Sequence, residues 1–350
     1  MHMADALLSP AVAATMFAAT GAVAAISIKE LKKDENTVKL PMMAVTAALV
    51  FAGQMVNYTI PGTGSSGHMC GGMMLAALLG PQAGFLSMMV ILAIQALFFA
   101  DGGLMAWGAN CWNMAFYGCF LGYYLIWRPI MHSHMFEKKK QAMRMRIALA
   151  SVLGCVLTLQ LGAFSVVLET TASGITELPF GAFVTIMQPI HLAIGLVEGV
   201  ITAAVLVFVY EARPELIMES DGAHTDAKRR FTVKKTLVML AILAAVTGGC
   251  FSLFASGKPD GLEWSMFGNA EAGYSTNMGL DEETYGTDSK AAQVSAQIQE
   301  KTAFLPDYAF SGSDSAMGTT TSGLVGSAIV AGVAALICVL GGFFRRKKSG

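Results

Sequence analysis

The chain has 350 residues, of which 54% are hydrophobic and 13% are charged, and its mean hydropathy is +0.56. A soluble domain carries about 25% charged residues, so this composition excludes an ordinary soluble protein and indicates that lipid surrounds much of the chain. The formal net charge of −1 provides no excess of basic residues that would favour a nucleic-acid partner.

Eight apolar runs are each about as long as the roughly 20 residues that cross a bilayer. They lie, in chain order, at 8–28, 40–57, 83–100, 104–127, 146–168, 180–209, 236–254 and 323–344. A shorter run at 69–80 is ambiguous by its length alone. The sequence therefore predicts an all-α polytopic membrane protein.

Lysine and arginine fall into four clusters that hold 20 of the 23 basic residues: 29–39, 128–146, 213–235 and 345–348. Basic residues in short loops mark the cytoplasmic side of a membrane, so the pattern places the amino terminus outside and the carboxyl terminus in the cytoplasm. The first cluster follows the first apolar run, which is the reverse of a secretory signal peptide. We therefore expect the amino terminus to be retained.

This topology requires an odd number of crossings between Tyr58 and Trp127, and three crossings fit if 69–80 is a short helix. The expected organisation is a seven-helix bundle at 1–210, a cytoplasmic linker at 211–235 and a region with two further membrane helices at 236–350.

Between the last two helices, 236–254 and 323–344, lies an external segment at 255–322 with ten acidic and three basic residues, a net charge of −7. Its Gly, Ser and Thr content and its weak periodicity predict a loosely ordered segment. Two interpretations are open: a solvated loop, or an external cap that attracts cations and gates a site.

The chain opens MHMADALLSP, which places a histidine beside the terminal amine. The Met1 amine, the His2 amide and the nearer imidazole nitrogen of His2 can close a five-membered and a six-membered chelate ring. Both rings favour a planar arrangement, and square-planar nitrogen sites suit Ni(II) and Cu(II). The amide must lose its proton to bind, so a site of this kind releases protons and weakens at low pH.

A second imidazole is expected to fill the fourth corner of this square. Four of the other histidines lie in basic cytoplasmic segments or inside a helix: His132, His134, His224 and His191. His68 lies on the outer side, in the glycine-rich stretch PGTGSSGHMCGG, where main chain can approach closely. The sequence therefore predicts a metal site formed by Met1, His2 and His68.

Ionisable and polar residues in membrane segments are costly and usually functional. Five are predicted to support the site or to relay an ion: Asp101, Asn110, Asn113, His191 and Glu198. His191 and Glu198 lie seven residues apart on one helix face, where they can form a buried pair or a relay. The two asparagines are expected to bond between helices. For Asp5, capping of the first helix is favoured over neutralising a metal.

Several motifs, in this order, resemble those of the NikM/CbiM family: MHMADALLSP, PGTGSSGHMCGG, GPQAGFL, IQALFFADGGL, GANCWNMAFYG and HLAIGLVEGVIT. The resemblance covers roughly residues 1–210. A second segment, SGKPDGLEW at 256–264, is similar to the PDGLE segment of NikN-type accessory subunits. The chain thus resembles a fusion of the metal-binding membrane component, or S component, of an energy-coupling-factor cobalt or nickel transporter with its small partner.

The resemblance implies the same ligands: the Met1 amine, the His2 amide and imidazole, and the imidazole of His68. It also implies a transmembrane coupling protein similar to NikQ or CbiQ, ATPase subunits similar to NikO or CbiO that dock from the cytoplasm, and the inner membrane of a prokaryote. The stretch MADALLSP after the opening departs from the usual family pattern, which leaves the fine geometry around the ligands open.

The expected function is therefore the substrate-binding component of an ATP-driven importer of nickel or cobalt. Nickel is favoured, because four planar nitrogens suit Ni(II). No organic cofactor is expected, and the chain is expected not to be an enzyme, since it has neither a phosphate-binding loop nor an H-E-x-x-H motif. The alternatives are a secondary cation transporter or channel that uses Asp101, His191 and Glu198, and a metal sensor.

Overall fold

The structure is a computed structural model that describes residues 1–33, 39–137, 141–174, 179–220, 231–269, 273, 286, 289–310 and 316–346. Within these residues the chain is mostly helical. Six helices are long and apolar enough to span a membrane: Pro10–Leu31, Pro81–Phe99, Ala142–Ser173, Phe180–Ala212, Val233–Phe254 and Met317–Ile337. The expectation of a polytopic, helical membrane protein is confirmed.

The elements of the first 216 residues are η1 (Asp5–Leu7), α1 (Pro10–Leu31), α2 (Lys39–Gln54), β1 (Tyr58–Ile60), β2 (Ser65–Gly67), α3 (Gly72–Leu79), α4 (Pro81–Phe99), α5 (Trp107–Cys111), the π-helix η2 (Trp112–Trp127), α6 (Arg128–Met131), α7 (Ala142–Ser173), α8 (Phe180–Ala212) and η3 (Pro214–Leu216). The elements that follow are α9 (Val233–Gly249), η4 (Phe251–Phe254), α10 (Gly261–Phe267), α11 (Lys290–Thr302), η5 (Pro306–Tyr308) and α12 (Ala316–Arg346).

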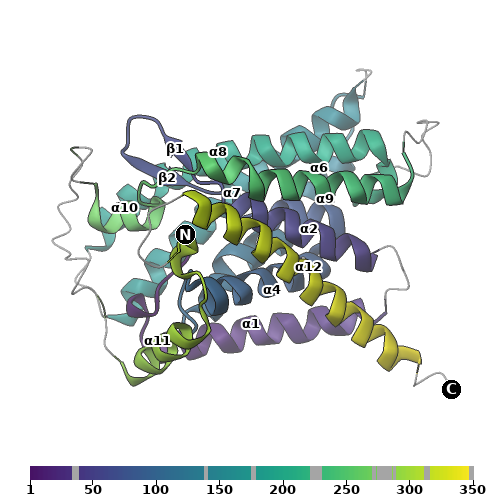
Figure 1. Ribbon diagram of the computed structural model, residues 1–350. Coiled ribbons are helices and arrows are strands. Elements are labelled where there is room, and N and C mark those ends of the chain that lie inside the picture. The colour runs from purple at the N-terminus through teal and green to yellow at the C-terminus, as the bar shows by residue number, and fades with distance from the viewer. Residues whose placement is uncertain are drawn as a thin grey trace.

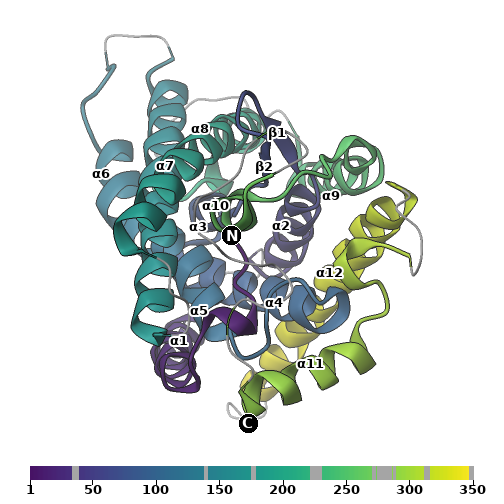
Figure 2. The same ribbon diagram turned by 90° about the vertical axis from the view of Figure 1, so that its left-hand side faces the viewer.

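The long helices run side by side along one direction, which is roughly horizontal in Figure 1. The short hairpin of β1 and β2 and the short helices α10 and α11 gather at one end of this bundle, and the carboxyl-terminal end of α12 lies at the other end. Seen from the first end, the amino terminus lies in the middle, among the ends of the helices (Figure 2). Residue 1 therefore lies in the interior of the bundle, near this end.

Helix α1 begins at Ser9, whose side chain accepts a hydrogen bond from Val12 N at 3.3 Å, with Pro10 in the first turn. Both features favour a helix start. The expectation that Asp5 caps this helix is therefore wrong. Asp5 Oδ1 instead accepts from Ala106 N at 2.8 Å, so it fastens the amino-terminal segment to the turn before α5.

The ambiguous run at 69–80 contains the short helix α3, which lies between Gly71 and Gly80. Both glycines have positive φ, at 85° and 81°, a conformation that other residues adopt only with strain. A side chain at Gly72 would lie 2.9 Å from Met114 O, so α3 packs closely on η2. This buried turn and helix fix the position of His68, which precedes them in the chain.

The two long helices of the carboxyl-terminal region pack on each other and on α2. Gly248 of α9 faces Gly323 of α12, and a Cβ at Gly323 would lie 2.5 Å from Gly248 O. Close approach of this kind is typical of membrane helices that meet at small residues. Gly326 of α12 lies against the ring of Phe51, which joins this region to the first bundle.

The expectation of a loosely ordered segment at 255–322 is wrong for the described part of that segment. Helix α10 begins at Asp260 with a complete capping box to Glu263, and α11 begins at Ser289, whose side chain accepts from Ala292 N. Such caps stabilise short helices even where periodicity is weak. The segment is also attached to the bundle, because Gln299 Nε2 donates to Ala96 O and Gly102 O.

Candidate metal centre

The amino-terminal segment enters the bundle and is buried from its first residue. Met1 is 5% exposed, and Met3 and Leu7 are fully buried. The main chain of Met3 is held from three sides: its N–H donates to Asn110 Oδ1 at 2.8 Å, its carbonyl accepts from Asn110 Nδ2 at 3.1 Å, and it also accepts from Gly103 N at 2.9 Å. Asn110 therefore positions the two residues that precede Met3.

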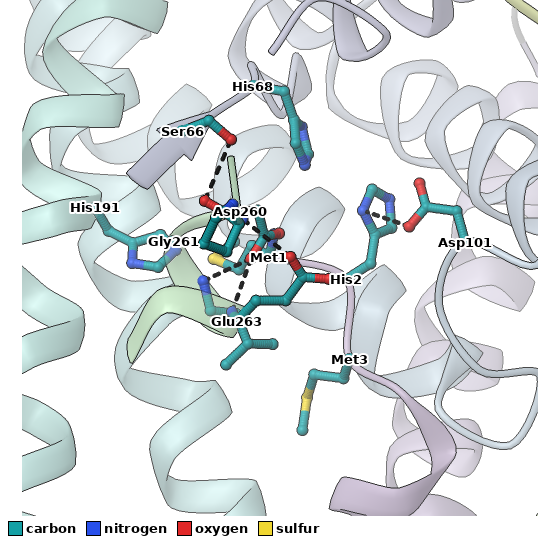
Figure 3. A network of polar contacts seen from close by, with 12 residues as sticks. Met1, His2, Met3, Ser66, His68, Asp101, His191, Asp260, Gly261 and Glu263 are labelled. Carbon is teal, nitrogen blue, oxygen red and sulfur yellow. Dashed lines mark hydrogen bonds and ion pairs between the residues drawn. The ribbon is translucent and has the colours of Figure 1, made fainter. Parts of the chain in front are cut away.

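The structure brings Met1, His2 and His68 together, as Figure 3 shows. The His2 and His68 rings are stacked, with centroids 5.3 Å apart and an interplanar angle of 26°. His68 Nδ1 lies 3.1 Å from Met69 O, and a carbonyl oxygen can only accept. Nδ1 therefore carries the proton, and the Nε2 lone pair of His68 is left for a ligand. The role of these residues as metal ligands stays a prediction.

The His2 ring has a polar partner at each nitrogen. Its Nε2 lies 3.1 Å from Gln95 Oε1, and its Nδ1 lies 3.2 Å from Asp101 Oδ1. Asp101 Oδ2 accepts in turn from the Tyr308 hydroxyl at 2.5 Å. Burial, with the charge of the terminal ammonium, lowers the pKa of His2 to about 3, and burial raises the pKa of Asp101. The His2 ring is therefore neutral and carries one proton on one of its two nitrogens, with Asp101 against Nδ1.

The Met1 amine forms an ion pair with Asp260, with 2.6 Å between N and Oδ2. Asp260 is held in place by the β2 strand, since Ser66 N donates to Pro259 O at 2.8 Å and Ser66 Oγ donates to Lys258 O at 2.7 Å. Burial is the largest single effect and lowers the pKa of the Met1 amine, but the charge and the hydrogen bond of Asp260, together with the nearby Cys70 and Asp101, raise this pKa overall. The carboxyl-terminal region thus contacts the first predicted ligand directly.

Asp260→Asn is expected to shift the pH dependence of nickel binding to lower pH. A metal can bind the amine only after the amine loses its proton. The raised pKa keeps the Met1 amine protonated to a pH above 8.0, the ordinary pKa of a terminal amine. Asparagine caps a helix start as well as aspartate does, so α10 is retained. Nickel titrations over a pH series test this expectation, with the exposed Glu300→Gln as the control; an unchanged profile in the Asp260 variant would contradict it.

Asn113 bonds between helices, as expected, since its Nδ2 donates to Glu169 Oε2 of α7 at 2.8 Å. It also contacts the Met3 sulfur at 3.6 Å. Both asparagines therefore contact the amino-terminal segment, Asn110 from α5 and Asn113 from η2.

The structure does not pair His191 with Glu198; among the described residues, each has other partners. His191 Nδ1 donates to Met187 O at 2.8 Å. The two Glu198 oxygens accept from Cys70 N and Gly71 N, each at 2.8 Å. A helix reading places both residues on one face, but main-chain groups nearby compete for them. Glu198 therefore holds the turn that follows His68.

Four residues beside the candidate ligands were missed from the sequence: Gln54, Gln95, Asp260 and Tyr308. Two of them are amides within apolar runs, a signal that was available because polar residues in membrane segments are usually functional. The other two lie more than 150 residues from the chain start, and nothing in the local pattern connects them with Met1. Asp260 belongs to the PDGLE motif, which marked the segment but not the contact.

Among the described residues, no group of three or more His, Cys, Asp and Glu side chains is arranged to hold a metal ion. The candidate centre is of another kind, because two of its four ligands are the terminal amine and a main-chain amide. Its donors are nitrogens, which suit Ni(II) in a square. Binding by this predicted set of donors would replace the proton of the Met1 amine, the proton of the His2 amide and the contact between Asp101 and His2 Nδ1.

Comparison with known proteins identifies two family models in the chain. The CbiM model, described as a cobalt uptake substrate-specific transmembrane region, matches residues 2–216. The PDGLE domain model matches residues 234–342. The two matches lie one after the other and are separated by residues 217–233.

The proteins that are similar to this chain are named as metal transport proteins. A putative fused nickel transport protein NikMN of Archaeoglobus fulgidus is 35% identical over 334 residues, which cover 94% of this chain and 95% of that protein. A cobalt transport protein CbiM of Sorangium cellulosum is 30% identical over 219 residues, 62% of this chain and 94% of that protein. A crystal structure of a transition metal transporter is 32% identical with a TM-score of 0.51, covering 61% of this chain and 94% of that one.

Proposed function

This chain belongs to the CbiM family of cobalt uptake substrate-specific transmembrane proteins, and on that premise we propose that it is the substrate-binding membrane component of an importer for nickel or cobalt ions. The observation that supports this most is the stacking of His2 on His68 beside the buried Met1 amine. The chain start and an imidazole from a distant turn therefore lie side by side.

The ion binds the Met1 amine, the deprotonated His2 amide, His2 Nδ1 and the lone pair of His68 Nε2. The first three donors close two chelate rings, and the fourth completes a square. This donor set favours Ni(II) over Co(II), because planar nitrogen ligation suits nickel. The neutral His68 fits this role, since burial and the nearby ammonium lower its pKa to about 4.

The end of the bundle that holds Met1, His2 and His68 faces the outside, and the basic segments face the cytoplasm. The carboxyl-terminal end of α12, at the opposite end of the bundle in Figure 1, is then cytoplasmic, which agrees with the positive-inside rule. Residues 1–210 are the metal-binding membrane domain with seven helices, 211–235 the cytoplasmic linker, and 236–350 the accessory region with its two membrane helices.

Energy for uptake comes from separate ATPase subunits, which act through a transmembrane coupling protein of the NikQ or CbiQ type in a prokaryotic inner membrane. The support for these partners is family membership together with the absence of a phosphate-binding loop from the sequence. The chain itself supplies the site and the change of shape that releases the ion inward.

Cells that express this chain with a coupling protein and an ATPase are expected to accumulate nickel, and cells with an inactive ATPase are not. Dissipation of the proton gradient at constant ATP is expected to leave accumulation unchanged. Accumulation that depends on the gradient and persists without the ATPase would refute the proposal in favour of a secondary transporter that uses Asp101, His191 and Glu198. Metal binding without any accumulation would favour a sensor.

A further inference from the structure

A chain of three hydrogen bonds, two of them buried and the one to His2 part-buried, connects the two histidine-bearing segments. Gln54 of α2 donates from Nε2 to Cys70 O at 2.8 Å, Gln95 of α4 donates from Nε2 to Gln54 Oε1 at 2.9 Å, and His2 Nε2 lies 3.1 Å from Gln95 Oε1. Gln95 is fully buried and Gln54 is 3% exposed. Water therefore does not compete for the bonds of Gln54 to Cys70 and of Gln95 to Gln54, and each glutamine amide must be satisfied within the protein.

The direction of this chain is fixed at its far end. Cys70 O is a carbonyl oxygen and can only accept, so Gln54 must turn its NH2 group toward it. The Gln54 oxygen then faces Gln95, which must present its own NH2 group, and the Gln95 oxygen faces His2. An oxygen acceptor at this position requires a proton on His2 Nε2.

This far end is itself anchored. Cys70 N donates to Glu198 Oε2 at 2.8 Å, and Gly71 N donates to Glu198 Oε1 at the same distance. The Cys70 peptide is therefore held from α8 on one side and from α2 on the other. The orientation of both glutamine amides follows from a main-chain group that cannot rotate freely.

A proton on Nε2 leaves Nδ1 as the His2 ring nitrogen with a lone pair. Nδ1 is also the ring nitrogen that closes a six-membered chelate with the His2 amide, whereas Nε2 points away from its own main chain. Metal-binding histidines commonly donate their other ring N–H to a partner that fixes tautomer and ring orientation. Gln95 has the position and the acceptor atom for this purpose.

We propose that Gln95 and Gln54 are positioning residues for metal binding: they fix the tautomer and the ring orientation of His2 and couple this ring to the turn that carries His68. The inference rests on the proposed function, because it assigns a purpose to the chain at that same site. It assigns these two glutamines no contact with the ion.

The tautomer provides a test that needs no metal. In the full-length protein labelled with ¹⁵N-histidine, the His2 signal, assigned with His2→Ala, is expected to report a proton on Nε2 and none on Nδ1 in metal-free protein at neutral pH. Gln95→Met is expected to give a mixture of both tautomers. A proton on Nδ1 alone in the unmodified protein, or an unaltered signal in Gln95→Met, would overturn the proposal.

Nickel affinity provides the second readout. Gln95→Met is expected to weaken nickel binding by about 10- to 100-fold, the usual cost of losing an outer partner of a metal ligand. Gln54→Met keeps the Gln95 acceptor but frees its orientation, so a smaller loss in the same direction is expected. The matched control is Gln82→Met on the same helix α4, whose side chain donates to the Tyr124 hydroxyl at 3.5 Å. This variant is expected to bind nickel normally.

Gln95→Glu separates positioning from packing. Protonated at this buried position, a glutamate side chain still presents one acceptor to His2 and one donor to Gln54, so binding within a few-fold of the unmodified protein is expected. Equal losses in Gln95→Glu and Gln95→Met would overturn the proposal. If the unmodified protein binds neither nickel nor cobalt, the proposed function fails, while the labelled-histidine signal still decides whether Gln95 fixes the tautomer of His2.

Discussion

His68→Ala is expected to weaken nickel binding by more than about 100-fold, beyond the range seen for loss of an outer partner. The variant removes one of four nitrogens and leaves an open corner in the square. Ring stacking on His2, at 5.3 Å between centroids, is lost as well, so His2 also loses a neighbour that orients it. Isothermal titration of purified protein with nickel measures the change.

The control for this variant is His134→Ala. His134 lies in the segment after α6, with a side chain that is 90% exposed and contacts Glu137, so its loss is expected to leave nickel affinity unchanged. Equal affinities of His68→Ala and the unmodified protein would place the metal elsewhere. Equal losses in both variants would indicate general damage to the fold rather than loss of a ligand.

Glu198→Ala is expected to destabilise the protein by about 3 kcal/mol and to weaken nickel binding at the same time. The substitution leaves the buried N–H groups of Cys70 and Gly71 without their acceptors, and each unsatisfied buried group costs about 1–3 kcal/mol. The turn that carries His68 then loses its fixed position. Thermal unfolding and nickel titration of the same preparation measure both effects.

Glu300→Ala is the matched control, because Glu300 is an exposed glutamate on α11 and is expected to change neither quantity. A secondary transporter that moves cations through Glu198 would behave differently: uptake would stop while stability and binding at Met1, His2 and His68 stayed normal. That outcome would contradict the structural role assigned to Glu198 here.

The membrane helices were predictable because their signal is local. Apolar runs near 8–28, 146–168 and 180–209 became α1, α7 and α8, with limits that differ by several residues because caps such as Ser9 decide where a helix begins. The short helix at 69–80 was also expected, from the number of crossings. The helices of the external segment were not expected, because their stability comes from caps and from contacts with distant residues.

The chemistry at the chain start was predictable for the same reason. Two adjacent residues define the chelate rings of Met1 and His2, and the choice of His68 followed from the side of the membrane on which each histidine lies. The partners of these residues could not be predicted. Asp260 reaches Met1 across 259 residues of sequence, and only folding brings such distant groups within hydrogen-bond distance.

The pairing expected for His191 and Glu198 shows a second limit. Spacing placed them on one helix face, but spacing does not reveal that the Cys70 and Gly71 N–H groups would lie against Glu198. Buried main-chain groups must find partners, and in this turn a carboxylate from another helix supplies them. A sequence reading that treats each helix separately cannot anticipate such a contact.

The most direct test of the account is a nickel titration of the unmodified protein and of a variant with one glycine added before Met1. The insertion turns the Met1 amine into an amide and moves the free amine away from Asp260, while every side chain keeps its identity. Tight binding is expected to be lost in the extended protein. Equal affinity of the two proteins would show that the terminal amine is not a ligand, and would contradict the site proposed here.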